Sequence, residues 1–488
     1  MKTLYSLCFI WLLLTFGCSK TKPDDIVAHV GNAVITKEEF KTRFATTPYF
    51  AGFPSDDPQT RTLALASLIG EKVLVEEAER AGLRDTEMYR AVTEQHEKEA
   101  VLEALLDQTF SDLTITQSEL DDAFNKNRRV LDVEELVFET RREAEQVQAQ
   151  LHPRESLSAW SQSKGDDAPE VRSYTVQWGS SEPAIEDTLW RLRIGETSGP
   201  VLFQGYYYVL RVAQEKANPF LSGNDLVQAM PQLRKVIEKR KRRVAYRKLF
   251  GNVMAGTSTK VPPKTLRYIA EEIEKAAGIQ PQDSSQFKPV LMREDEYSRA
   301  RDNLSARLHE KFITFADGSI WTIGDYLSNL RYGPYPLNYS SRSAFRMSLR
   351  VMTITMLEQE YIEREGRKRG LQNSDYVRDE KRMWSDAFLA DQMRLALVRN
   401  PRRNEKGGEV INNGNAAKID QFLSEVFRSY EVNINHAILD TLKLVHLKMV
   451  VFKTHFPGRA VVPLILPFDR LQRFFSEAYT KIKKREKD

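Results

Sequence analysis

The sequence predicts a mostly α-helical protein that carries one inserted α+β segment and in which a helical module occurs twice. Runs with helical spacing of apolar residues dominate the chain; they cover residues 59–81, 86–109, 224–250, 343–369 and 375–398. Between residues 131 and 215, short runs of strand composition alternate with Gly and Pro turns. The landmarks that open and close the first helices recur later in the same order.

The amino terminus predicts export. Lys2 precedes an apolar run over residues 4–16, which has the length of a signal-peptide core and is too short for a permanent membrane helix. We therefore expect residues 1–17 to be a signal peptide. No later stretch approaches the roughly 18 apolar residues of a membrane-spanning helix.

The stretch Leu14-Thr-Phe-Gly-Cys-Ser19 resembles a bacterial lipoprotein cleavage site. The resemblance implies that Cys18 is the lipidated first residue of the mature chain, with residues 18–25 as a tether and Ser19 favouring the outer membrane. Ordinary small-x-small cleavage at Thr15 and Gly17 would instead leave Cys18 as a free thiol. Either way, loss of Cys8 leaves one cysteine and no internal disulfide.

Composition excludes several classes of function. The formal net charge of +4 is too small to indicate a nucleic acid partner. The seven histidines show no metal-ligand spacing, and the chain has no Gly-rich phosphate loop, so we expect neither a nucleotide nor any other cofactor. With 41% hydrophobic and 29% charged residues, the chain suits several ordinary soluble domains.

The first helical module is predicted over residues 26–130. Alternating apolar residues on either side of Gly31-Asn32 predict a hairpin, and Thr36 with Glu39 predicts a capping box that opens a helix. The following helix should end at Gly82, because glycine readily adopts the left-handed conformation that closes helices.

Residues 131–215 resemble a parvulin-type (PpiC-like) peptidyl-prolyl isomerase domain. The resemblance rests on residues 183–192, 195–201 and 205–211, which occur in the order and spacing of that family. It implies that two facing histidines of the family correspond to Glu135 and Tyr207, and its cysteine or aspartate to Asp166. The family's proline pocket corresponds to Ser181 and Ile185.

These replacements predict weak or absent isomerase activity. Prolyl isomerisation has a barrier of about 18–20 kcal/mol, and the resemblance implies that catalysis needs the histidine pair and an aromatic pocket. An active peptidyl-prolyl isomerase is the alternative.

A second helical module is predicted over residues 301–440. Its Asp317-Gly318 turn and Thr322 cap follow those of the first module by 286 residues, and Gly370 follows Gly82 by 288. Residues 216–300 between the modules are interpreted as a return helix and a linker. The basic face of the return helix is interpreted as solvated or, alternatively, as a contact surface for anionic headgroups or an acidic client. Residues 441–488 are interpreted as a hairpin followed by a basic helix.

The hairpin, cap and helix together resemble the chaperone modules of SurA- and PrsA-type envelope folding factors. The resemblance implies a periplasmic protein that holds unfolded secreted or outer-membrane polypeptides; a structural adaptor in an envelope complex is the alternative. Aromatic residues in the loops after the two caps are then either core residues or a client cradle. These candidates are Tyr49, Phe50, Phe53, Tyr332 and Tyr335.

Overall fold

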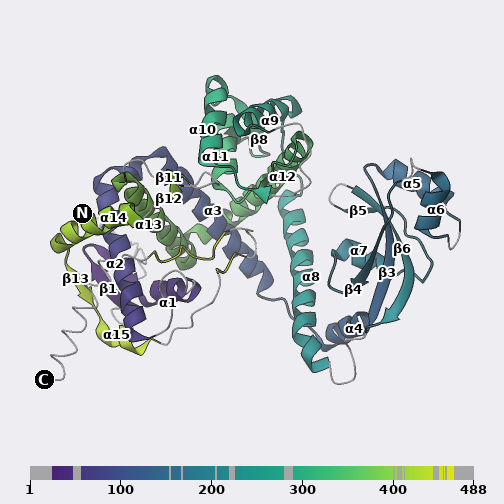
Figure 1. Cartoon of the computed structure of the whole chain (residues 1–488), viewed down its shortest axis with the longest axis horizontal. Coiled ribbons are helices and arrows are strands. Elements are labelled where there is room, and N and C mark those ends of the chain that lie inside the picture. The colour runs from purple at the N-terminus through teal and green to yellow at the C-terminus, as the bar shows by residue number, and fades with distance from the viewer. Residues whose placement is uncertain are drawn as a thin grey trace, which may run out of the picture. The chain divides into compact units, whose positions relative to one another are not determined.

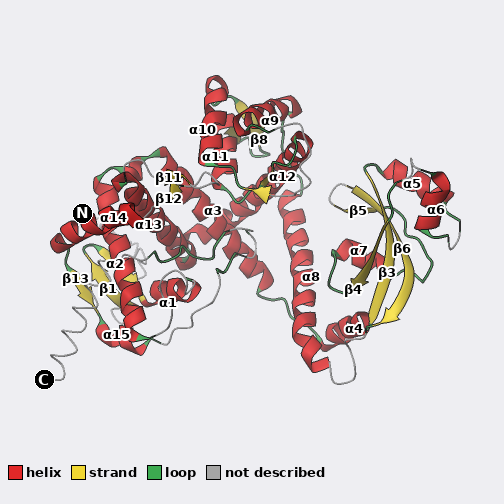
Figure 2. Ribbon diagram, in the orientation of Figure 1, coloured by secondary structure: helices red, strands yellow, loops and turns green. Residues whose placement is uncertain are grey.

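The computed structural model forms two compact units that are described separately (Figures 1 and 2). A helical unit contains residues 1–105 and 253–488, and an α+β unit contains residues 106–252. The structure describes residues 25–47, 57–152, 155–165, 169–203, 206–218, 226–279, 289–398, 402–403, 409–410, 413–442, 450–453, 456 and 459–466. The expectation of a mostly α protein is confirmed, and the described sheets are small and antiparallel.

The helical unit begins with a hairpin and two long helices. Its elements are β1 (Ile26–Val30), β2 (Ala33–Thr36), α1 (Lys37–Thr46), α2 (Pro58–Arg80), the 3-10 turn η3 (Leu83–Asp85) and α3 (Glu87–Phe110). The side chain of Thr36 caps α1, and Gly82 has the left-handed φ of 75° between α2 and η3. Both features lie where the sequence predicts them.

The later part of the unit has the same local order. Its elements are α9 (Pro263–Ala277), β7 (Pro289–Val290), α10 (Glu294–Asn303), η4 (Ser305–Arg307), β8 (Lys311–Thr314), β9 (Ile320–Thr322), α11 (Ile323–Tyr332), β10 (Leu337–Asn338), α12 (Arg342–Lys368), η5 (Leu371–Asn373) and α13 (Asp375–Leu397). Thr322 caps α11 at the end of a hairpin, and Gly370 has a φ of 78° between α12 and η5.

Short elements complete the helical unit. They are β11 (Arg402–Arg403), β12 (Glu409–Val410), α14 (Asn413–Val426), η6 (Phe427–Ser429), β13 (Val432–Ile434) and α15 (His436–Thr441). Strand β13 pairs with β1, so the first hairpin becomes a three-stranded sheet of order β13-β1-β2.

The described part of the helical unit has two large apolar cores. The first joins β1, β2, α1 and α2 to α13 and α14, and the second joins α9, α10, α11 and α12 to β8 and β9. Helix α9 buries Ile269 and Ile273 completely in the second core. The helical part of the segment interpreted as a return helix and a linker is therefore packed in a core, and Pro263 begins this helix instead of interrupting one.

The long helices of the helical unit interlock. Lys72 of α2 forms an ion pair with Asp386 of α13 at 2.7 Å, and Lys98 of α3 lies 3.7 Å from Glu360 of α12. Helices α2 and α3, from the beginning of the chain, thus contact α13 and α12, from its later part. Between α3 and α13, the rings of His96 and Trp384 stack with their centroids 4.5 Å apart.

The α+β unit is a four-stranded antiparallel sheet of order β4-β3-β6-β5 with helices on both faces. Its elements are α4 (Gln117–Asn127), β3 (Arg129–Phe138), α5 (Arg141–Gln150), α6 (Leu157–Lys164), β4 (Arg172–Gln177), α7 (Pro183–Leu189), β5 (Val201–Phe203), β6 (Tyr206–Ala217) and most of α8 (Leu226–Met254). One face packs on α7, and the other packs on α5 and α6.

The basic residues of α8 are partly neutralised within the α+β unit. Arg240 pairs with Glu186 and Asp187, and Lys241 lies 2.7 Å from Glu119. These contacts occupy part of the basic face with the protein's own carboxylates. No helix in the described residues is long and apolar enough to cross a membrane.

Candidate functional site

The α7 face of the sheet carries a polar cluster centred on Glu135. This carboxylate is only 6% exposed, and its Oε2 accepts a hydrogen bond of 2.6 Å from the hydroxyl of Tyr174 on β4. Burial and the negative charge of Glu135 raise the pKa of Tyr174 and that of Tyr208 on β6. Arg172 approaches Glu135 at 3.8 Å from the exposed edge strand β4.

Glu135 and Tyr207 do not face each other, which corrects the sequence interpretation. In the β3–β6 register, Glu135 pairs with Leu210, Val137 with Tyr208 and Phe138 with Tyr207. Paired residues share a face and successive residues alternate, so Tyr207 lies on the opposite face with α5 and α6. Tyr208 of β6 instead shares the face of Glu135, together with Leu210.

The structure brings one further predicted residue to this face. Ile185 of α7 is 5% exposed and packs in the same apolar cluster as Tyr174 and Tyr208. Ser181 lies just before α7, where its backbone N–H donates to Glu186 Oε1 at 2.6 Å. Asp166 lies outside the described residues.

This cluster offers little acid–base chemistry. The Glu135 carboxylate already accepts a hydrogen bond from the Tyr174 hydroxyl, and a phenol whose pKa is raised stays neutral near pH 7. The neighbouring Glu134 points to the other face, where it accepts hydrogen bonds from the N–H groups of Leu157 and Ser158 and pairs with Arg211. That carboxylate therefore holds the start of α6 in place.

The aromatic candidates of the second module are largely internal. Tyr335 is 5% exposed, lies in the second core and donates a hydrogen bond of 2.8 Å to Gln359. Tyr332 is half-buried and lines a polar cavity of about 620 Å³ between α3 and α11. Tyr335 is thus a core residue in this structure and not part of an exposed client cradle. Tyr49, Phe50, Phe53 and Cys18 lie outside the described residues.

A second candidate site holds a stretch of the protein's own chain with no regular secondary structure, residues 459–466, here called the tail segment. Arg43 of α1 donates to the carbonyl oxygens of Pro463, at 3.0 Å from Nε, and of Leu464, at 3.2 Å from Nη2. The hydroxyl of Thr47 accepts from the N–H of Ile465 at 3.0 Å. Side chains of the first module therefore bind the main chain of the tail segment.

A buried ion pair holds the side chain of Arg43 in the position from which it binds the tail segment. Its guanidinium is fully buried and makes two hydrogen bonds, of 2.5 and 2.8 Å, to the carboxylate of Glu71 on α2. Burial opposes the charge of Arg43, but Glu71 outweighs it and raises the pKa of Arg43. A bidentate pair leaves the remaining guanidinium N–H groups aimed at the tail.

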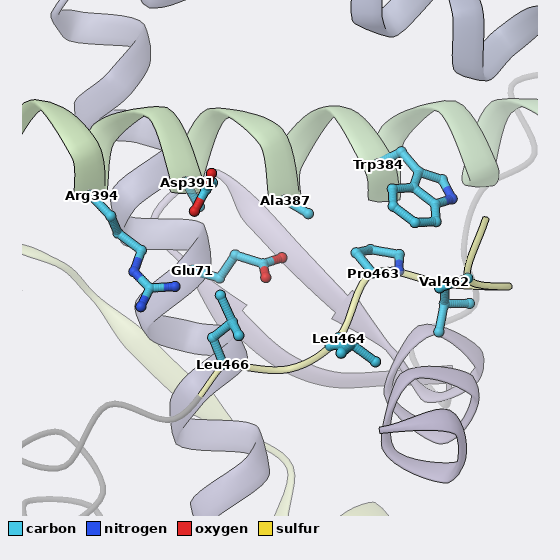
Figure 3. A pocket seen from close by; sticks show the side chains of 11 residues that line it. Glu71, Trp384, Ala387, Asp391, Arg394, Val462, Pro463, Leu464 and Leu466 are labelled. Atoms are coloured by element: carbon cyan, nitrogen blue, oxygen red, sulfur yellow. The ribbon is translucent and has the colours of Figure 1, made fainter. Parts of the chain in front are cut away.

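An apolar cavity of about 260 Å³, here called the first cavity, adjoins this stretch (Figure 3). Side chains of α13, among them Trp384 and Ala387, form one side, and Pro463, Leu464 and Leu466 of the tail segment form the other, with Glu71 between them. Sequence reasoning missed this site because Arg43 and Glu71 look like surface residues of amphipathic helices. The burial of Arg43 depends on contact with Pro463, which lies 420 positions later in the chain.

A smaller space, the second cavity, lies between α12 and α3 and measures about 20 Å³. Three of its lining residues stand 288 positions from residues that line the first cavity: Gln359 corresponds to Glu71, Glu99 to Ala387 and Leu102 to Ala390. The side chains of Tyr335 and Phe456 also line the second cavity.

Comparison with solved structures finds matches that cover about half of this chain. One match comes from work on PEB4 and Cj1289, two structurally related SurA-like chaperones of Campylobacter jejuni. It covers 49% of this chain and 100% of the matched chain, at 13% identity and a TM-score of 0.25. The chain is similar to SurA-like and PrsA-type proteins. PrsA from Bacillus cereus matches 43% of this chain and 83% of its own, at 15% identity and a TM-score of 0.20.

A third match, PrsA from Bacillus anthracis, covers 45% of this chain and 99% of its own, at 15% identity and a TM-score of 0.18. No protein-family model matches the sequence, and neither does any curated protein.

Proposed function

We propose that this protein is a folding factor of the bacterial envelope that holds unfolded secreted or outer-membrane polypeptides. The observation that carries the proposal is the first cavity, where Arg43 and Thr47 bind the main chain of the tail segment beside an apolar space. Every polypeptide has the same backbone carbonyl and N–H groups, so such contacts do not select a sequence. That is the property a holder of diverse unfolded chains requires.

Two copies of one helical module lie within residues 26–130 and 301–440, and residues 131–215 are a parvulin-like insert. Equivalent local structure at Thr36 and Thr322, and likewise at Gly82 and Gly370, supports the duplication. Lipidated Cys18 tethers the chain to the outer membrane, on its periplasmic side.

Helix contacts support the duplication independently. A shift of 288 positions turns the contact of Lys72 with Asp386 into that of Glu360 with Lys98, and both pairs occur. The same shift relates His96 to Trp384, which stack on each other as residues beside a local two-fold axis would.

The isomerase-like unit has little or no activity in this proposal. Glu135 and Tyr208 share a face, but neither is an imidazole, and the carboxylate is bound to Tyr174. The unit would then serve as a spacer or as an additional client surface.

The proposal is tested by two assays on the full chain and on a chain lacking residues 131–213. We expect stoichiometric suppression of client aggregation by both proteins, equal within about twofold. We also expect no acceleration of proline-limited refolding, with an active parvulin as the positive control. Strong acceleration that disappears with the deletion would show an isomerase. A full chain that fails to suppress aggregation of any unfolded envelope protein would refute the holding function.

A further inference from the structure

We propose that residues Val462–Leu466 are a resident occupant of a polypeptide-binding site, and that an extended aliphatic segment of a client displaces them. This inference rests on the proposed holding function and specifies where the client binds. The first cavity then accepts client side chains, while Arg43 and Thr47 bind the client main chain in place of the tail segment.

The contacts that hold Val462–Leu466 are ones that another chain can reproduce. In the described part of the protein, the polar contacts of this stretch are the two from Arg43 and the one to Thr47, all with main-chain atoms. Val462 and Ile465 each add a buried side chain with 1% exposure, whereas Leu466 is 41% exposed. Any aliphatic segment in extended conformation offers equivalent groups.

The preceding residues are anchored differently. Lys453 is buried and lies 2.6 Å from Glu103 of α3 and 3.1 Å from Glu380 of α13. Arg459 pairs with Glu99 at 3.3 Å, and Phe456 is 1% exposed. Removing one partner of a buried ion pair is costly, so this part stays bound while Val462–Leu466 leaves.

The size and lining of the first cavity identify its ligand as side chains of a polypeptide. Its volume of about 260 Å³ lies below the roughly 300–1,000 Å³ of sites that enclose a whole small molecule. Trp384, Ala387 and Ala390 provide its apolar wall on α13. Aliphatic side chains on an extended backbone fill such a space while the backbone remains with Arg43.

The second cavity shows what a filled site of this kind looks like. There, Tyr335 and Phe456 leave only about 20 Å³. The position of Arg43 is taken by Asn329, which cannot offer a planar fork of charged donors. We therefore assign client binding to the first cavity alone.

The experiment measures binding of a fluorescein-labelled peptide with the sequence of residues 459–466 to the full chain by anisotropy. Ile465→Asp places a charge at a buried position of Val462–Leu466. We expect this change to release Val462–Leu466 and to leave the binding site intact. We expect the peptide to bind this variant at least about tenfold more tightly, because the apparent affinity rises with the fraction of open sites. Leu466→Asp, at a residue that is already exposed, is a milder variant for which we expect about threefold tighter binding.

A matched pair of substitutions on α13 locates the site. In the Ile465→Asp chain, Ala387→Phe fills the first cavity and should weaken peptide binding at least about tenfold. Ala396→Phe adds the same group at an exposed position of the helix and should leave the affinity unchanged. A control peptide with Asp at the positions of Leu464 and Ile465 should not bind.

The outcomes separate this inference from the proposed function. If both Asp variants bind the peptide with wild-type affinity, or if Ala387→Phe has no effect, the displacement proposal is wrong. Wild-type suppression of aggregation in that case would keep the holding function and place its site elsewhere. If wild type suppresses no aggregation, the proposed function itself fails.

Discussion

The first cavity lies between α2 and α13 and the second between α12 and α3, and the chain fills these two spaces differently. The first is lined on α13 by residues that include Trp384, Ala387 and Ala390, and beside it Arg43 binds the main chain of the tail segment. The second is closed by two aromatic side chains of the protein itself. The difference teaches that one framework can serve either as a core or as a site, depending on a few side chains.

The lysine side chains that join the two helix pairs, Lys72 and Lys98, also differ in how deeply they are buried. Lys72 is 2% exposed and lies within 2.8 Å of both Glu39 and Asp386. Burial would raise the pKa of Glu39, but Lys72 and Arg43 outweigh it and hold that pKa below its ordinary value. Lys98, at the equivalent contact of the other helix pair, is 20% exposed and lies 3.3 Å or more from its carboxylates.

The largest predicted effect tests this contrast. Lys72→Met should lower the free energy of unfolding by about 3 kcal/mol, because it leaves two buried carboxylates without their shared cation. Lys98→Met should cost less than about 1 kcal/mol, since its pairs are partly solvated. Urea unfolding of both variants measures the difference. Equal losses would mean that the two helix pairs are electrostatically alike.

A smaller effect concerns pH at the junction of α3 and α13. Burial, with Arg459 and Lys453 nearby, lowers the pKa of His96 to about 3. The unfolded chain therefore binds a proton near pH 6.5 that the folded chain does not, so stability present above pH 6.5 is lost as the pH falls toward 3. Between pH 6.5 and 5 this loss amounts to about 2 kcal/mol.

His96→Phe should remove that part of the pH dependence and keep the stacking on Trp384. The measurement is the unfolding free energy of wild type and variant from pH 5 to 7, with His309→Phe at an exposed histidine as the control. Nearby carboxylates with raised pKa, such as Glu380, respond in the opposite direction. The difference between the two proteins isolates His96, and parallel curves would contradict the prediction.

The smallest effect compares the two caps. Thr322 forms a full capping box with Asp325, whereas Glu39 turns to Lys72 and leaves the box at Thr36 half-formed. Each hydroxyl still accepts one N–H at 3.1 Å, so Thr36→Ala and Thr322→Ala should each cost about 1 kcal/mol. Thermal unfolding measures both losses. A cap that can be removed without effect would show that the two junctions are not equivalent.

Local signals in the sequence predicted the elements well, and long-range contacts limited the rest. Thr36, Gly82 and Thr322 act within a few residues of their partners, so their roles can be read from the sequence. The face of Tyr207 depends on strand register, and a shift of one residue reverses it. The role of Arg43 depends on the tail segment, which no local pattern connects to it.

The interlocking of early and late helices determines when this protein can fold. Lys72 must wait for Asp386, which is 314 positions later, and Arg43 must wait for Pro463, which is 420 positions later. Contacts between such distant residues slow folding, and a chain is synthesised from its amino terminus first. The apolar face of α2 therefore stays partly uncovered until nearly the whole chain has been synthesised. During that interval the protein is itself an unfolded polypeptide in need of a partner.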